Sequence, residues 1–326
     1  MRFAFAGTPE FGAWVLHDLL SLGRRPELVV SQPARPRGRG RKVSESPVSL
    51  AAAEAGLSVL TPPDINSGEV IGSLGAARVD CLVVAAFGQL LRADLLDALP
   101  CINVHASLLP AYRGAAPIHW ALRNGEQTTG VSIMRIIEPL DAGPVAARVS
   151  LSINLWDDGA SVGRALALLG ALAMDRVLQA TVDGTVVWQD QPDQSTYAPK
   201  VTAADRTLDL RLSALACHNL VRALVPDTAA EMRAEGLTLR VWRTWPWLDE
   251  EDARVPEAAL RVWNRPGRLA HSRGARGRLF VGCGSGALEI LAVQPAGRGV
   301  MGHAEFLCGY GGRLPDCVQV PEAEAG

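Results

Sequence analysis

The chain opens with MRFAFAGTPEF, from Met1 to Phe11, and this stretch decides the fold class. Residues 2–6 form a short, mostly apolar run that ends at Gly7, as is typical of a buried strand. Pro9 suits the first turn of a helix, because its missing N–H would have no intrahelical partner there. The stretch therefore predicts a strand, a turn and a helix.

The same alternation continues along the chain to about residue 190. The sequence predicts further strands at residues 28–31, 80–86, 101–104, 130–137 and 145–153, and further helices at residues 49–55, 117–125 and 160–180. Strands that alternate with helices indicate an α/β fold with a doubly wound, mostly parallel sheet.

A polar, proline-interrupted segment follows this pattern, and a different one comes after it. We place a first domain at residues 1–190, a linker at 191–207, a second domain at 208–315 and a tail at 316–326. One helix and several short β-type runs, separated by Gly and Pro, predict a smaller, β-rich, barrel-like second domain. The Gly-rich and then acidic end, from residue 309, is expected to fray.

Composition narrows the function classes. The 326 residues are 48% hydrophobic and 20% charged, with a formal net charge of -2, so we expect a soluble globular protein whose contacts with polyanions are local. Without an apolar run of ~18 residues or a leader, a cytoplasmic protein with no membrane contact is expected. The six cysteines have no CxxC spacing, so neither a metal nor a redox site is predicted.

Potentially reactive side chains are densest where the strand at residues 101–104 ends. Asn103 and His105 alternate along an extended backbone, so both point to the same side. An amide donor and an imidazole there suit acyl transfer: Asn103 would hold an oxyanion, and His105 would stabilise it or move protons. Asp141, in a turn between two predicted strands, is the candidate that orients the imidazole. The structural alternative is that Asn103 and Asp141 cap turns and His105 is a hydrogen-bonded core residue.

Two other sequence patterns bear on whether the protein binds phosphate groups. The first turn, at residues 7–12, fits neither GxGxxG nor a P-loop, which argues against a nicotinamide cofactor. A cationic run follows the strand at residues 28–31 and suits a phosphate backbone, although a solvated surface loop is the alternative. Its cations are Arg35, Arg37, Arg39, Arg41 and Lys42.

The second domain also carries clustered arginines, six of them within residues 261–278, which would fit contact with phosphates. Its tryptophans could stack on bases, with a place in the hydrophobic core as the alternative. They are Trp242, Trp245, Trp247 and Trp263.

Taken together, these motifs resemble the methionyl-tRNA formyltransferase family, over nearly the whole chain. The resemblance is carried by GTPEF at 7–11, GRGRK at 38–42, INVHASLLP at 102–110, YRGAAPI at 112–118 and LDAG at 140–143, and beyond the linker by TYAPK at 196–200, HNLVRA at 218–223 and VQPAG at 293–297.

This resemblance implies a formyltransferase-like first domain that binds 10-formyltetrahydrofolate, the formyl donor, without a metal. The formyl group would pass to the amino group of methionyl initiator tRNA, for translation initiation, with the cationic run contacting the tRNA and the protein acting as a monomer. Asn103, His105 and Asp141 would be catalytic. The folate site would include Phe87, Gly88, Leu90, Ser107, Leu108, Leu109 and Pro110.

Two positions depart from the family pattern. Ala142 stands where Thr is usual, and residues 225–228 lack the common Asn-Pro-Trp-Pro run. Two other functions stay open: formyl transfer to a sugar amine or a peptide carrier, and RNA binding without catalysis. Formation of N-formylmethionine from 10-formyltetrahydrofolate and methionyl-tRNA would separate all three.

Overall fold

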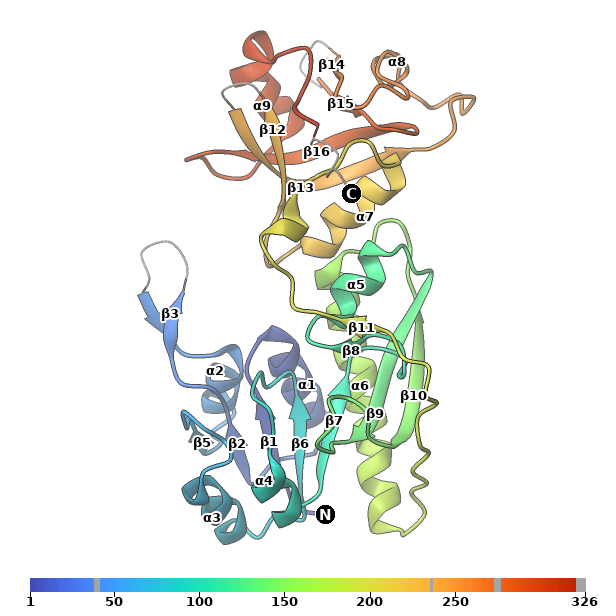
Figure 1. The fold of residues 1–326 in the computed structure, drawn as a ribbon. Coiled ribbons are helices and arrows are strands. Elements are labelled where there is room, and N and C mark those ends of the chain that lie inside the picture. The colour runs from blue at the N-terminus through green and yellow to red at the C-terminus, as the bar shows by residue number, and fades with distance from the viewer. Residues whose placement is uncertain (38–41, 235–236, 273–276, 321–326) are drawn as a thin grey trace. The chain divides into compact units, whose positions relative to one another are not determined.

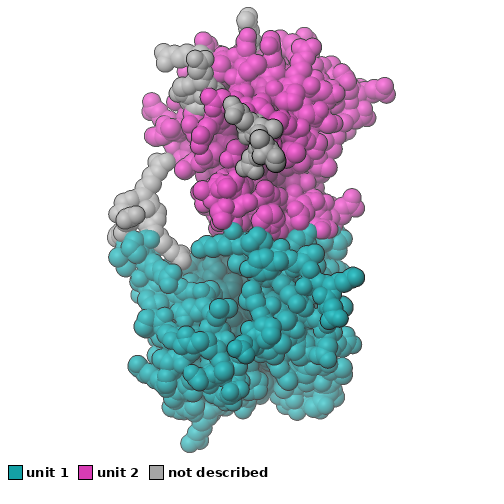
Figure 2. Space-filling model, in the orientation of Figure 1, with its two compact units in different colours: residues 1–118, 128–153, 161–200 teal, residues 119–127, 154–160, 201–326 magenta. Residues whose placement is uncertain are grey.

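The computed structural model describes residues 1–37, 42–234, 237–272 and 277–320. The chain divides into two compact units, which Figure 2 distinguishes by colour. The first unit comprises residues 1–118, 128–153 and 161–200, and the second comprises residues 119–127, 154–160 and 201–326. The boundaries predicted at residues 190 and 208 remain predictions about where independently folding domains begin and end.

The first unit is built on a mostly parallel sheet, as predicted, in which β1, β6 and β7 lie side by side (Figure 1). Strands β7, β6, β1, β2 and β5 are parallel, and β9 and β10 add an antiparallel edge beside β7. Their bounds, in sheet order, are β10 (Val145–Ser152), β9 (Thr128–Arg135), β7 (Cys101–His105), β6 (Cys81–Ala85), β1 (Phe3–Gly7), β2 (Leu28–Val30) and β5 (Val59–Leu60).

Helices connect these strands, and local capping explains where some of them begin. The Ser46 hydroxyl accepts a hydrogen bond from the Ser49 N–H at 2.9 Å, and Pro47 occupies the first turn of the helix that follows. The helices are α1 (Glu10–Ser21), α2 (Pro47–Glu54), α3 (Gly68–Ala76), α4 (Ala93–Ala98), α5 (Pro117–Arg123) and α6 (Gly159–Val182); two small strand pairs join β3 (Arg35–Arg37) to β4 (Lys42–Ser44) and β8 (Arg113–Gly114) to β11 (Tyr197–Ala198).

The chain changes direction across the sheet at β1, which lies between β2 and β6. Ligands of open α/β sheets bind beyond the carboxyl ends of the strands, at such a switch point. The backbone is tightly packed there, since a Cβ on Gly12 would lie 2.7 Å from the Ala85 carbonyl oxygen. This packing brings the loop after β1 against the loop after β6, where the Thr8 hydroxyl donates to the Phe87 carbonyl at 2.7 Å.

Helix α6 has the length and composition that could span a membrane; one face of it, which includes Leu166, Met174 and Leu178, is buried in the first unit, and Leu168 and Leu172 are exposed. A Cβ on Gly170 would lie 2.5 Å from Cγ1 of Val104 and 3.3 Å from Cγ2 of Val131. The helix axis therefore lies unusually close to strands β7 and β9. This close approach makes α6 the core helix behind the end of β7.

The second unit contains an antiparallel sheet, in agreement with the predicted β-rich domain. Helix α7 begins after Ser213, whose hydroxyl accepts a hydrogen bond from the Ala216 N–H, and its apolar face packs in the core of the unit. The sheet order is β12 (Ala230–Ala234), β13 (Leu237–Trp247), β16 (Ala287–Pro295), β15 (Leu279–Gly282) and β14 (Leu269–His271), with β17 (Met301–Gly302) on β16; the helices are η1 (Ala204–Arg206), α7 (Ala214–Leu224), α8 (Glu257–Leu260), α9 (His303–Tyr310) and η2 (Gly311–Arg313).

The fraying expected from residue 309 does not hold as far as residue 320. Val318 is only 5% exposed, and its N–H donates to the Gly267 carbonyl at 2.8 Å. Burial of this one apolar side chain anchors a segment whose composition is otherwise typical of a loose end. Residues 321–326 lie outside the described residues.

Candidate active site

Strand β7 carries two of the candidate catalytic residues, Asn103 and His105, which lie two positions apart. It lies between β6, to which it is parallel, and β9, to which it is antiparallel. His105 is 5% exposed at the carboxyl end of the strand, and Asn103 is partly buried. Within the described part of the chain the Asn103 side chain makes no hydrogen bond, so its amide is available to a ligand.

The His105 imidazole lies between two acceptors. Its Nε2 is 3.0 Å from the Tyr112 carbonyl oxygen, and its Nδ1 is 3.7 Å from Oδ2 of Asp141. A carbonyl oxygen can only accept, so Nε2 carries a proton. The Nδ1–Oδ2 distance is longer than a hydrogen bond but within the range of an ion pair. A ring that donates toward both acceptors must carry a proton on each of its nitrogens.

Asp141 lies in the turn between β9 and β10, and its backbone has a φ of 50°, in the left-handed region. This conformation is uncommon for a residue other than glycine, although Asp tolerates it better than most. Oδ2 accepts a hydrogen bond from the Gly114 N–H at 2.8 Å, which directs the carboxylate toward His105. Gly143 is required nearby, because a Cβ there would lie 1.9 Å from the Arg135 carbonyl oxygen.

The loop after β7 is held by the hydroxyl groups of two residues from other parts of the chain. The Ser132 hydroxyl, on β9, donates to the Ser107 carbonyl at 2.7 Å and accepts from the Leu109 N–H at 3.0 Å. The Thr196 hydroxyl accepts from the Tyr112 N–H at 2.8 Å. Thr196 is the first residue of the TYAPK motif, whereas serine is too common for Ser132 to be picked out without coordinates.

The predicted folate residues differ in exposure. The side chains of Phe87, Ser107 and Leu109 are buried, so these three shape the loops from beneath. Leu90, by contrast, is 71% exposed, and Leu108 and Pro110 are partly buried. Gly88 has a φ of 82°, and a Cβ there would lie 2.7 Å from the Gln32 side-chain nitrogen, so this position requires glycine.

The two ends of the cationic run form a strand pair, and the loop interpretation of residues 38–41 falls outside the described residues. Arg37 pairs with Lys42 and Arg35 with Ser44 in the register of β3 and β4. The Arg35 side chain is exposed. Arg39 and Arg41 lie outside the described residues.

In the second unit, one member of the arginine cluster has a structural role. Arg278 donates from Nε and Nη2 to the two carboxylate oxygens of Glu289, both at 2.6 Å, and Glu289 is 3% exposed. The guanidinium also lies 5.6 Å from the centre of the Trp247 ring. Arg278 is therefore committed to the unit's own packing, and so is Trp247, whose Nε1 donates to Glu289.

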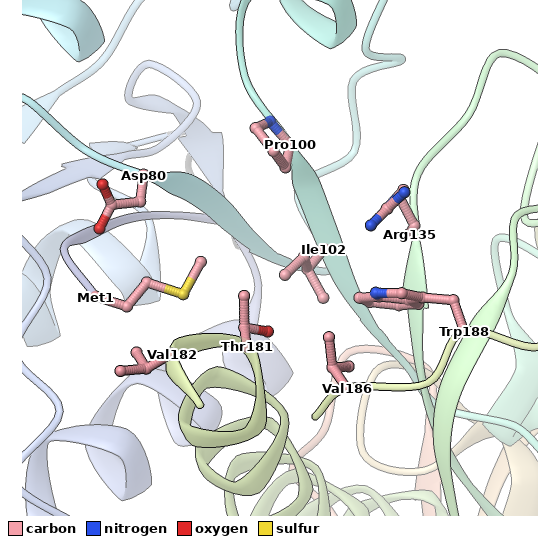
Figure 3. A pocket seen from close by; sticks show the side chains of 9 residues that line it. All are labelled: Met1, Asp80, Pro100, Ile102, Arg135, Thr181, Val182, Val186 and Trp188. Atoms are coloured by element: carbon pink, nitrogen blue, oxygen red, sulfur yellow. The ribbon is translucent and has the colours of Figure 1, made fainter. Parts of the chain in front are cut away.

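A pocket of about 460 Å³ lies elsewhere in the first unit, near the amino ends of β6 and β7 (Figure 3). Ile102 and Arg135 line it, and the Arg135 guanidinium lies 4.8 Å from the centre of the Trp188 ring. None of the predicted site residues that the structure describes lines this pocket. It is separate from the polar groups at the carboxyl end of β7.

The cysteine on β7 does not offer a nucleophile. Burial raises the pKa of the Cys101 thiol to about 12, so it stays protonated at neutral pH. Among the residues that the structure describes, no group of three His, Cys, Asp or Glu side chains is placed to hold a metal ion.

Comparison with known proteins finds formyl transferases as relatives over nearly the whole chain. Residues 1–178 match the formyl transferase family, and residues 200–311 match the formyl transferase C-terminal domain. A methionyl-tRNA formyltransferase of Geobacter metallireducens is 37% identical over 313 residues, which cover 95% of this chain and 96% of the relative. One of Methylococcus capsulatus is 40% identical over 310 residues, covering 94% of this chain and 96% of the relative.

Two solved structures share the fold at low sequence identity. HypX from Aquifex aeolicus, in complex with tetrahydrofolic acid, has a TM-score of 0.66 at 16% identity; the match covers 96% of this chain but 48% of that one. The sugar 3N-formyl transferase WlaRD, in the presence of dTDP and 5-N-formyl-THF, has a TM-score of 0.62 at 13% identity, covering 91% and 98% of the two chains.

Proposed function

The chain belongs to the methionyl-tRNA formyltransferase family, and from this we propose how its residues carry out the reaction of that family. It transfers the formyl group of 10-formyltetrahydrofolate to the amino group of methionyl-tRNA for translation initiation. We assign the chemistry to Asn103, His105 and Asp141. The observation that carries the assignment is the position of the Asn103 amide, two residues before an imidazole that faces a carboxylate.

The reaction needs a group that stabilises charge on the formyl oxygen. When the neutral amine attacks the formyl carbon, the carbonyl oxygen becomes negative, and the folate nitrogen leaves with a proton. The Asn103 amide would donate to that oxygen, and its partly buried position strengthens the interaction. His105 would donate to the oxygen or move the proton between the amine and the leaving nitrogen. Asp141 would orient the ring and support it electrostatically.

We place the folate beyond the carboxyl ends of β6 and β7. The loop after β6, with Gly88 and Leu90, and the loop after β7, with Leu108 and Pro110, leave the sheet at this edge. Phe87, Ser107 and Leu109 would support these loops through their buried side chains. This placement follows the rule for ligands of open α/β sheets.

We place tRNA contact on the cationic run, from Arg35 to Lys42, because its charges stand out against a chain with a net charge of -2. Selection of the initiator tRNA, action as a monomer and a cytoplasmic location are part of this proposal. The packing of one face of α6 in the core of the first unit supports the absence of a membrane span.

The test is formation of N-formylmethionine when the purified protein is mixed with 10-formyltetrahydrofolate and methionyl-tRNA. Asn103→Ala should lower kcat on the order of 100- to 1,000-fold, the loss typical of removing one oxyanion donor. Its Tm should stay close to that of the unchanged protein, because the Asn103 side chain has no partner in the structure's described residues.

A parallel reaction with amino sugars as acceptors serves as the control for substrate class. Formylation of a sugar amine in place of methionyl-tRNA would reject the tRNA as substrate. Full turnover of a folded Asn103→Ala protein would reject the oxyanion assignment and leave the reaction itself standing.

A further inference from the structure

Gln191 joins the two segments that hold the candidate carboxylate. Its side-chain nitrogen donates to the carbonyl oxygens of Asp141 at 2.8 Å and Gly143 at 2.7 Å. Its side-chain oxygen accepts from Nη2 of Arg113 at 2.8 Å and from Nε at 3.1 Å. One amide group therefore bridges the turn after β9 and the short strand β8.

The chemistry of the partners fixes which end of this amide faces which segment. Two backbone carbonyls can only accept, and a guanidinium can only donate. Turning the amide over would break all four contacts at once. The arrangement is thus complementary, and Gln191 is the residue type that supplies two donors and an acceptor at this length.

The position of Gln191 is itself fixed by the backbone. Two residues earlier, the Gln189 N–H and carbonyl exchange hydrogen bonds with the carbonyl and N–H of Val145, at 3.0 and 2.8 Å, where β10 begins. This pairing brings the chain back beside the turn that contains Asp141. The polar composition of the segment predicts an interdomain linker, and its contacts in the first unit are not apparent from the sequence.

Gln191 supports the two segments that hold the Asp141 carboxylate, the turn after β9 and the strand β8. Asp141 has its backbone in the left-handed region, so the turn needs outside support to keep that shape. Gln191 supplies this support at the carbonyls of Asp141 and Gly143. It also holds Arg113, whose neighbour Gly114 donates its N–H to Oδ2 of the Asp141 carboxylate.

We propose that Gln191 is a positioning residue for formyl transfer, which keeps Oδ2 of Asp141 facing Nδ1 of His105. The inference depends on the roles given to those two residues under the proposed function. Gln191 acts through Asp141 and touches no reacting atom. It does so by fixing the turn on one side of the carboxylate and β8 on the other.

The first measurement is steady-state kinetics of two variants. Gln191→Met keeps the side-chain length and removes all four hydrogen bonds, and Gln191→Glu keeps the acceptor for Arg113 but loses both donors to the carbonyls. Each should lower kcat roughly 10- to 100-fold, as expected when a catalytic group is displaced by about 1 Å. KM for methionyl-tRNA should change less than kcat. Gln194→Met, at an exposed site three residues later, is the matched control and should leave both constants unchanged.

A double-mutant cycle separates positioning from general support of the fold. In an Asp141→Asn background the carboxylate is already gone, so adding Gln191→Met should cost little further turnover. The inference is overturned if Gln191→Met lowers kcat by the same factor in both backgrounds. It is also overturned if neither Gln191 variant lowers kcat in the unchanged background. If Gln191→Met does not fold, Gln191→Glu carries the cycle. A protein that forms no N-formylmethionine before any substitution contradicts the proposed function instead, so the two failures are distinguishable.

Discussion

At the scale of single residues, the site depends on a carboxylate that is close to an imidazole without bonding it. Oδ2 of Asp141 is 3.7 Å from His105 and 2.8 Å from the Gly114 N–H, so the backbone, and not the ring, fixes the direction of the carboxylate. Such a contact acts mainly through charge. A substitution that keeps the shape and removes the charge is therefore the sharpest probe of its role.

Asp141→Asn should lower kcat at least ~100-fold, because the ring would lose the negative charge that faces its Nδ1 while it moves a proton. Asparagine is preferred to alanine here, since both Asp and Asn tolerate the φ of 50° at this position. Single-turnover formylation measures the loss, and thermal unfolding measures the stability. Near-normal turnover of the folded variant would remove Asp141 from the mechanism.

A second residue-scale prediction concerns pH and lies in the second unit. Burial lowers the pKa of His218 to about 4, and its Nε2 donates to the Leu155 carbonyl at 2.8 Å while its Nδ1 faces the Thr244 hydroxyl at 2.9 Å. In the unfolded chain the pKa returns to about 6.5. Between these values the unfolded state binds a proton that the folded state excludes. Stability from His218 is therefore complete above pH 6.5 and is lost as the pH falls toward 4.

The stabilisation that His218 loses between these two pKa values amounts to about 3 kcal/mol. His218→Gln keeps a donor for the Leu155 carbonyl but cannot titrate. The measurement is the free energy of unfolding of both proteins at several pH values between 4 and 7. The difference between them should shrink as the pH falls, and a difference that stays constant would show that His218 takes up its proton equally in both states.

At the scale of elements, the sequence is most informative where a whole strand or helix is buried. Apolar runs, whose side chains are stable only when buried, predict the strands β1, β6 and β7 and the helix α6. The helix α3, by contrast, has the sequence GEVIGSLGA, whose three glycines hide its periodicity. The strand pair of β3 and β4 is not predicted, because Pro36 and the neighbouring arginines give no strand pattern.

Replacing one glycine by alanine should stabilise the protein in helix α3 and destabilise it in helix α6. Gly72, in α3, has none of the described atoms near its Cβ position, so Gly72→Ala should raise the free energy of unfolding by roughly 0.5–1 kcal/mol. At Gly170, in α6, a Cβ would lie 2.5 Å from Val104, which precedes His105 on β7. Overpacking there costs ~1–3 kcal/mol, more than the gain in helix propensity.

Urea unfolding of Gly72→Ala and Gly170→Ala decides between these signs. Because the strain at Gly170 falls on β7, formyl transfer should also slow in that variant and stay unchanged in Gly72→Ala. Equal stabilisation by both substitutions would mean that α6 can move away from the sheet without cost.

For the whole molecule, the sequence predicts the two-part architecture and the residues of the candidate site better than the way that site is held. Asn103 and His105 can be paired by counting along one strand, whereas Asp141 needs a turn of unknown shape to return. Gln191 cannot be found, because a polar, proline-interrupted segment looks the same whether it crosses solvent or lines a site. Short polar contacts between distant segments leave no periodic trace in a sequence.

Charge is also a property of the whole molecule, and it sets the last prediction. If the cationic run contacts the tRNA backbone, changing Arg35, Arg37 and Lys42 to Gln should lower the log–log salt dependence of tRNA binding by roughly 0.7 to 0.9 for each phosphate that is no longer neutralised. The matched control changes three arginines in exposed ion pairs, Arg2, Arg211 and Arg254, and so removes the same total charge. Binding measured from low to moderate salt should give a shallower slope for the first protein only. Equal slopes for both triple variants would assign the attraction to net charge alone, and the run would then be solvated surface.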